Sequence, residues 1–126
     1  MRSWEYKAAM KEMSLSKMTE MVLKFRQERD WAQFHTAKEL AISLVVESAE
    51  LLEIMQWRQG AQLQEAIEKR KEEIADELGD VLHSVLLIAH DLGIDLSDAF
   101  VQKLRKAGEK YPIEKAKGKA AKYHEL

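Results

Sequence analysis

Two pairs of acidic residues interrupt the apolar stretches of this chain, and each pair has the spacing that places both members on one side of a helix. Glu47 and Glu50 are three residues apart, and Glu77 and Asp80 repeat the spacing further along. Positions i and i+3 of a helix are neighbours on its surface. Two such helices, facing each other, would bring four carboxylates together. This cluster would repel itself and would be costly to bury unless a cation neutralised it.

The neighbours of these acids are those of a helix core. On a helical projection, most residues flanking Glu47 and Glu77 are apolar: Leu40, Leu44, Leu51 and Ile54 around the first, and Ile74, Val81 and Ile88 around the second. Amphipathic helices usually keep carboxylates away from the buried stripe. Carboxylate oxygens are hard ligands that suit Mg2+ or Mn2+ better than zinc. We therefore expect a magnesium or manganese site, and the plainer alternative is a solvated face in a chain with 33% charged residues.

The composition is that of one soluble helical domain. Of 126 residues 46% are apolar, and one proline with five glycines is too little punctuation for a sandwich or barrel. The absence of cysteine excludes disulfides, thiolate metal sites and cysteine nucleophiles. A net charge of −2 gives no overall attraction to nucleic acid, and the longest apolar run, residues 81–89, is too short to span a bilayer. We expect a cytoplasmic protein with no membrane or specific nucleic-acid partner.

Capping residues and breaks in the pattern predict four helices, and so an all-α, four-helix bundle-like subunit. Residues 1–13 have weak periodicity and are expected to form a flexible N-terminal segment. A first helix follows a cap at Ser14 or Ser16 and ends at about Arg29. Residues 30–35 break the helical pattern, and we expect a loop there.

The second and third helices should carry the two acidic pairs. A capping box, with Thr36 as the cap and Glu39 as the third helical residue, opens the second helix. In an antiparallel hairpin, residues at one level are numbered symmetrically about the turn. The acidic pairs therefore place the centre of the turn between Leu63 and Gln64. The second helix should end around Gln59 for the four acids to meet.

The third helix should begin around residues 64–66 and run to Leu92, where Gly93 stops it. Its second half, VLHSVLLIAHDL, is apolar on nearly every side, which one small bundle cannot easily cover. We therefore expect a buried central helix with part of its surface against another subunit. The predicted assembly is a homodimer or a dimer of dimers, and a core helix of a monomer is the alternative.

The end of the chain contains the fourth predicted helix and a basic tail. Asp95 or Ser97 caps this helix, which ends near Lys110 because the following Tyr-Pro pair cannot easily continue it. These patterns predict one helical domain over residues 14–112 and a lysine-rich C-terminal tail over residues 113–126.

The sequence around both acidic pairs resembles that of a known family. The strings ELAISLVVESAELLEIMQW and EEIADELGDVL carry an ExxE and an ExxD motif, with 26 residues between Glu50 and Glu77. They are similar to the MazG-like nucleoside triphosphate pyrophosphohydrolases. The flanking pieces RDWAQFH, residues 29–35, and KYP, residues 110–112, look most like the dCTP pyrophosphatase branch of that family. The likeness extends over residues 15–126.

The resemblance implies an all-α, Mg2+-dependent enzyme that assembles as a homotetramer. It implies cleavage of a nucleoside triphosphate between the α- and β-phosphates, which yields a monophosphate and pyrophosphate. The candidate substrates are dCTP and modified pyrimidine deoxynucleotides, and the expected role is nucleotide pool sanitation, with precursor control as the alternative. By the resemblance, four residues map onto the metal ligands: Glu47, Glu50, Glu77 and Asp80.

The resemblance also assigns the base pocket. Trp31 and Trp57 map onto aromatic residues that line it in the family. Two positions depart from the family pattern. Ser84 stands where the dCTP branch has a tyrosine, and Ala107 stands where an asparagine is frequent.

Two further roles follow from the chemistry of phosphoanhydride hydrolysis. Glu50 is expected at the edge of the acidic cluster, where a carboxylate can take the proton of the attacking water. We therefore predict it as the catalytic base, and service as a ligand only is the alternative. Lys103, Lys106 and Lys110 lie near one side of the fourth helix and are candidates to hold phosphates. Tyr111, from the KYP piece, is placed with them as substrate-binding.

Two other functions fit part of the pattern. A carboxylate-rich di-metal redox bundle uses two Glu-x-x-His pairs, whereas this chain offers only Asp80-x-x-His83. A non-catalytic helical oligomerisation or binding module would use the acids only to fix the register of its helices. Thermal melting with Mg2+ and with a non-hydrolysable dNTP separates the module from the enzyme, and colour or iron uptake would indicate the redox bundle.

Overall fold

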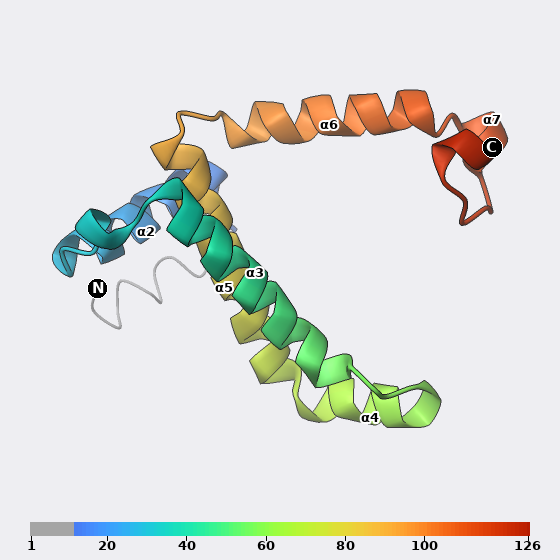
Figure 1. Ribbon diagram of the computed structural model, residues 1–126, viewed down its shortest axis with the longest axis horizontal. Coiled ribbons are helices and arrows are strands. Elements are labelled where there is room, and N and C mark those ends of the chain that lie inside the picture. The colour runs from blue at the N-terminus through green and yellow to red at the C-terminus, as the bar shows by residue number, and fades with distance from the viewer. Residues whose placement is uncertain (1–11) are drawn as a thin grey trace. The chain divides into compact units, whose positions relative to one another are not determined.

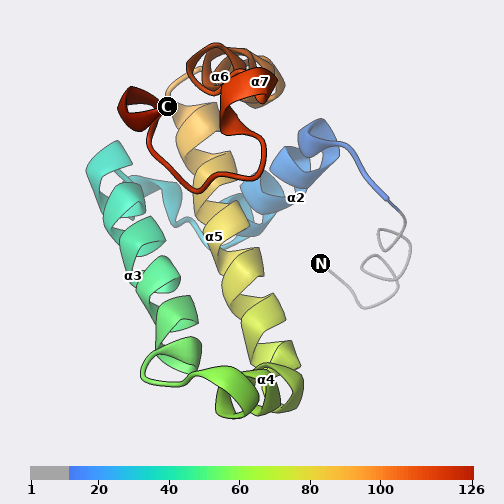
Figure 2. The same cartoon turned by 90° about the vertical axis from the view of Figure 1, so that its right-hand side faces the viewer.

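The computed structural model describes residues 12–126, and every regular element in this range is helical (Figures 1 and 2). This confirms the predicted all-α class. The chain divides into two compact units after Gly93. The flexible segment predicted for residues 1–13 lies almost wholly outside the described residues. The predicted bounds of the helical domain and of the basic tail stay predictions.

The first unit is organised around two antiparallel helices. Helix α3 (Ala37–Met55) lies along α5 (Lys71–Asp91), and the short α4 (Gly60–Lys69) connects them (Figures 1 and 2). Helix α2 (Leu15–Glu28) packs across α5, and the one-turn helix η1 (Ala32–Phe34) leads from α2 to α3. The loop predicted before α3 is therefore a loop that contains one helical turn.

The core of this unit lies where α2 and α3 meet α5. The buried apolar residues of the described chain are Leu40, Ile54, Ala66, Leu86, Leu87 and Ala89. Three of them belong to the second half of α5, the segment that the sequence predicts to be a buried central helix. Buried apolar area is the main favourable term in folding, so the packing of α3 on α5 fixes the frame on which the acidic residues are mounted.

Side-chain caps begin three of the helices as predicted. Ser14, Thr36 and Asp95 each accept a hydrogen bond from the backbone N–H three residues later, at 3.1, 3.1 and 3.0 Å. Each bond satisfies a donor that has no partner within the helix. Ser14 and Asp95 are thus the caps, and the alternatives Ser16 and Ser97 lie inside their helices.

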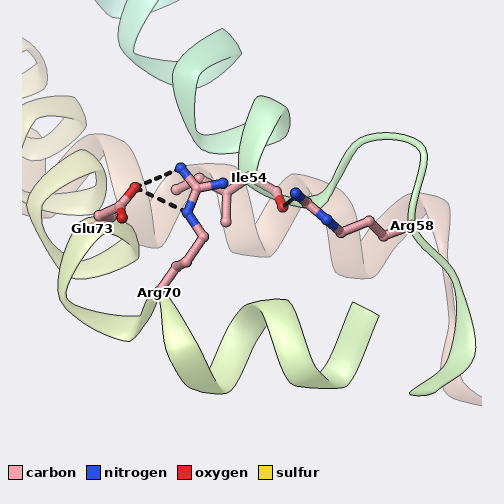
Figure 3. Close-up of polar contacts among 4 residues, drawn as sticks. All are labelled: Ile54, Arg58, Arg70 and Glu73. Carbon is pink, nitrogen blue, oxygen red and sulfur yellow. Dashed lines mark hydrogen bonds and ion pairs between the residues drawn. The ribbon is translucent and has the colours of Figure 1, made fainter. Parts of the chain in front are cut away.

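The connection between α3 and α5 differs from the prediction. The sequence predicts one helix from residues 64–66 to Leu92, but the separate helix α4 begins at Gly60 and the chain breaks again at Arg70. Arg70 leaves helical geometry at φ −112° and ψ 27°. Its guanidinium then donates to Glu73 Oε2 at 2.5 and 3.0 Å on the first turn of α5 (Figure 3). This local ion pair favours a new helix start at Arg70.

The end of α3 also comes earlier than the predicted Gln59. The helix stops at Met55 because Gln56 turns away at ψ 140° and Trp57 takes a left-handed conformation at φ 67°. The guanidinium of Arg58 donates to the carbonyl of Ile54, which would otherwise lack a partner in the last turn (Figure 3).

The second unit contains α6 (Leu96–Lys110), the short α7 (Ile113–Ala116) and the one-turn helix η2 (Tyr123–Glu125). The predicted end of the fourth helix at Lys110 is confirmed. The Nζ of Lys110 lies 4.9 Å from the ring centroid of Tyr123, close enough for a cation–π contact that ties the tail to α6. Within residues 12–126, no helix has both the length and the apolar character needed to cross a bilayer.

Candidate active site

The structure brings three of the four predicted ligands together. One carboxylate oxygen from each of Glu47, Glu77 and Asp80 lies within 4.8 Å of the other two. The first residue is on α3 and the others are one turn apart on α5. They meet because α3 and α5 are antiparallel. Met55, the last residue of α3, and Lys71, the first residue of α5, each lie eight residues from Leu63, so residues at similar distances from Leu63 are at the same level. The centre of the turn is therefore close to where the acidic pairs predict it.

Glu50 lies beside this group rather than within it. It follows Glu47 by one turn of α3, and its side chain is exposed. Burial is the main cause that raises the pKa of the Glu47 and Glu77 carboxyls, and the neighbouring Glu50 carboxylate raises the pKa of both further. Glu50 thus faces solvent on one side and the acidic group on the other.

The acidic group has unsatisfied oxygens at its centre. Glu47 Oε2 and Glu77 Oε2 are both buried and have no hydrogen-bond partner. Burial raises the pKa of Glu47 to about 7, and the neighbouring Glu77 carboxyl and the charge of Asp80 are further causes. At neutral pH the group therefore needs a positive charge between its oxygens, either a proton or a cation.

A cavity of about 240 Å3 opens beside the carboxylates. Its lining comes from the segment before α3 and from α3 and α5: Trp31, His35, Leu40, Ser43, Glu47, Asp80, His83, Ser84 and Leu87. The lining thus combines two carboxylates with one indole and two imidazole rings. A ligand that carries a flat ring on one end and binds cations at the other would match both parts.

The two predicted base-pocket tryptophans occupy different places. Trp31 lines the cavity, is 44% exposed, and meets the Phe25 ring edge to face with 5.9 Å between centroids. Trp57 is 90% exposed and is not among the cavity's lining residues. The structure therefore places only Trp31 at the carboxylates.

Two histidines at this cavity are not among the predicted site residues. The Nδ1 of His35 is buried and lacks a hydrogen-bond partner. Burial lowers the pKa of His83, which favours its neutral form at pH 7. A signal for His83 was present in the sequence, since it follows Asp80 by three residues and so shares its helix face. For His35 the signal is its place at the end of the RDWAQFH piece, residues 29–35, which resembles the dCTP pyrophosphatase branch.

Comparison with known proteins identifies the family. A model of the MazG-like family matches residues 42–126. The chain is 34% identical to dCTP pyrophosphatase 1 of Rattus norvegicus and 32% identical to that of Homo sapiens, in both cases over 91% of this chain and 69% of the relative. A pyrophosphatase structure from Archaeoglobus fulgidus matches with a TM-score of 0.74 and 35% identity, over 81% of this chain and 95% of that one. The chain belongs to the MazG-like family.

This membership confirms the resemblance and the predicted enzyme class, a nucleoside triphosphate pyrophosphohydrolase. The segment that matches the family contains all four acidic residues. The composition of the acidic group also disfavours the di-metal redox bundle. Such a site needs histidine ligands, whereas the group of potential metal ligands found within residues 12–126 contains carboxylates only.

The remaining site residues predicted for this MazG-like chain belong to the second unit. Lys103, Lys106 and Lys110 are exposed on α6. Tyr111 follows that helix, and its ring meets the Tyr123 ring edge to face with 6.2 Å between centroids. The role of these four residues in substrate binding stays a prediction.

Proposed function

We propose that this MazG-like chain hydrolyses a deoxynucleoside triphosphate between the α- and β-phosphates, with a divalent cation held by the acidic group. The proposed cation is Mg2+, with Mn2+ as the alternative. The observation that carries the proposal is the group of three carboxylate oxygens within 4.8 Å beside a cavity lined by Trp31. The curated relatives are named dCTP pyrophosphatase 1, so the proposed substrate is dCTP or a modified pyrimidine deoxynucleotide.

The acidic residues fit a hard divalent cation. Glu47 and Glu77 each present a buried oxygen that has no other partner, and Asp80 adds a third oxygen within reach. Oxygen-only donor sets of this kind favour Mg2+ and Mn2+ over softer metals. When bound, such an ion supplies positive charge that attracts the triphosphate, offsets charge in the transition state and acidifies a water.

Glu50 is the proposed catalytic base. Its carboxylate is exposed and lies at the edge of the acidic group, where it can accept the proton of the water that attacks phosphorus. Glu50→Gln keeps the shape of the side chain and removes the proton acceptor. We expect kcat to fall at least about 100-fold while nucleotide affinity changes little. Unchanged turnover would remove Glu50 from the mechanism, and Glu68→Gln on α4 is the matched control.

The cavity is the proposed site for the nucleoside. Trp31 offers a ring face on which a base can stack, an interaction of about 1–3 kcal/mol in other proteins. His35 Nδ1 is a buried polar atom without a partner, and it can hydrogen-bond to the edge of a base. Ser84 is 6% exposed at the cavity wall, and its small side chain leaves space that a tyrosine would fill.

We also propose that the chain acts as a homodimer or a homotetramer. Several large apolar side chains of α3 and α5 are exposed: Ile42, Val45, Val46, Leu52, Leu78 and Leu82. An apolar surface of this kind on two neighbouring helices marks a site of association, and homo-oligomers commonly use one surface on both copies. Light scattering after size-exclusion chromatography tests this proposal. A monomer at micromolar concentration would contradict it.

The activity is tested by a pyrophosphate-release screen over the eight common ribo- and deoxynucleoside triphosphates, with Mg2+, with Mn2+ and with EDTA. We expect release only with a cation, and the highest kcat/KM for a pyrimidine deoxynucleotide. Chromatography should show a nucleoside monophosphate rather than a diphosphate, because the α–β bond is cleaved. No release from any substrate would overturn the proposal.

A further inference from the structure

A largely buried ion pair joins the last turn of α2 to the last turn of α5. Arg26 Nη1 and Nη2 donate to the two carboxylate oxygens of Asp91 at 2.9 and 2.8 Å. The side chains are 10% and 24% exposed, respectively. Arg26 is the one charged residue that is buried among residues 12–126. Neither residue lines the cavity beside the acidic group.

Stability alone is a poor explanation for this pair. The loss of water around two charges offsets most of their attraction, and an apolar pair of similar size often stabilises a protein as well. The pair adds direction, because two parallel N–H···O bonds fix the plane of the guanidinium against the carboxylate. The end of α2 is therefore held in one orientation on α5.

The backbone of Arg26 carries this orientation into the next segment. Its carbonyl accepts the N–H of Trp31 at 3.2 Å, and the carbonyl of Gln27 accepts the N–H of Asp30 at 3.0 Å. Asp30 is left-handed at φ 53°. These features form a Schellman motif, the usual device that ends a helix in a defined direction. The apolar contact that accompanies such motifs is made by the rings of Phe25 and Trp31.

We propose that Arg26 and Asp91 are positioning residues, whose ion pair fixes Trp31 at the wall of the cavity that contains Glu47 and Asp80. The connection is short. The Asp91 carboxylate accepts two hydrogen bonds from the Arg26 side chain, and the Arg26 carbonyl accepts one from the backbone N–H of Trp31. The inference rests on the proposed function, in which the cavity takes the nucleoside. The pair thus acts on substrate binding through the indole and leaves the hydrolytic step to the acidic group.

The first test replaces the pair by apolar residues of similar length, Arg26→Met with Asp91→Leu. The melting temperature should stay within a few degrees, since such replacements are commonly neutral. KM for the preferred substrate should rise about tenfold, discrimination between bases should weaken, and kcat should stay within about twofold. An unchanged KM would overturn the inference. It would also be overturned if kcat and KM both changed and the melting transition were lost, because the ion pair would then have a purely structural role.

A conservative variant and a matched control complete the kinetic test. Arg26→Lys keeps the charge but cannot make two parallel bonds, so KM should rise by a smaller factor while the melting temperature is kept. Glu65→Gln removes the exposed ion pair with Lys69, whose atoms are 2.6 Å apart on α4, and should change neither KM nor kcat. Equal effects of the Arg26 and Glu65 variants would count against the inference.

A spectroscopic readout tests the position of Trp31 without relying on activity. With Trp4 and Trp57 replaced by phenylalanine, Trp31 is the only tryptophan of the chain. Removal of the ion pair should then lower its fluorescence anisotropy and increase quenching by acrylamide. Unchanged fluorescence in an active enzyme would overturn the positioning role alone. A chain that hydrolyses no nucleotide would overturn the proposed function, and the fluorescence would still decide the role of the pair.

Discussion

The two tryptophans that flank the acidic helix α3 are held in opposite ways. The backbone N–H of Trp31 donates to the Arg26 carbonyl, and the Trp31 ring packs against Phe25. Trp57 is 90% exposed and itself adopts the left-handed backbone, at φ 67°. The sequence assigns the same role to both, yet only Trp31 stands at the cavity.

The difference lies in which residue takes the left-handed conformation. Before Trp31 it is Asp30, a residue type that tolerates φ above zero. At the end of α3 it is the bulky Trp57, for which this conformation is strained. Strain of this kind persists where the surroundings or the function require it. Trp31 is thus held in place before any ligand binds, whereas the strain at Trp57 has no structural explanation within residues 12–93.

The largest expected effect belongs to the acidic group, which sets the baseline for comparing the tryptophans. Glu77→Gln removes one of the three converging carboxylates. We expect kcat to fall at least about 100-fold, because the charge that holds a cation is lost. Pyrophosphate release at saturating Mg2+ measures this effect. Asp76→Asn, at the neighbouring exposed position, should retain activity, and equal activity of both variants would remove Glu77 from the site.

The next effect compares the two tryptophans directly. Trp31→Ala should lower kcat/KM about 10- to 100-fold, mostly through KM, because a stacking surface of about 1–3 kcal/mol is lost. Trp57→Ala should lower it by less than about threefold if Trp31 alone supports the base. Steady-state kinetics with the preferred nucleotide measures both. An equal loss in the two variants would break the comparison and would place Trp57 at the bound substrate.

The predictable parts of this molecule are those set by local spacing. Ser14, Thr36 and Asp95 cap helices as their sequence neighbours require. The i, i+3 spacing likewise places each acidic pair on one side of its helix, and the symmetric numbering of the hairpin brings the two pairs to the same level. The predicted centre of the turn remains nearly correct although α4 is a separate helix. It depends on where α3 ends and α5 begins, and not on the path of the chain between them.

The parts that sequence could not supply depend on side-chain packing. The break at Arg70 has no proline or glycine to mark it, and it coincides with the pairing of Arg70 and Glu73. The ion pair of Arg26 and Asp91 joins residues 65 positions apart. Its partners can be matched only once α2 is known to pack on α5. The exposed place of Trp57 similarly follows from the early end of α3, which the helical pattern does not signal.

The pH dependence of stability separates the acidic wall of the cavity from both tryptophans. The folded chain raises the pKa of Glu47 from 4.5 to about 7. Protonated Glu47 therefore contributes stability that is complete below its unfolded pKa and is lost as the pH rises toward 7. In EDTA, between about pH 5 and pH 8, the wild-type melting temperature should fall relative to that of Glu47→Gln. The alanine variants of Trp31 and Trp57 should show the same change of melting temperature with pH as the wild type. If Glu47→Gln shows that same change, Glu47 is not the group that titrates.

The smallest expected effect tests the strain at Trp57. Glycine adopts the left-handed region freely, and an exposed ring contributes little packing, so Trp57→Gly should raise stability by up to about 1 kcal/mol. Trp31→Gly should instead lower it, because that ring packs on Phe25 and its own backbone is not left-handed. Chemical denaturation of both variants measures the difference. If Trp57→Gly is the destabilising change, the indole must be covered in solution, which would place it in the proposed contact between subunits.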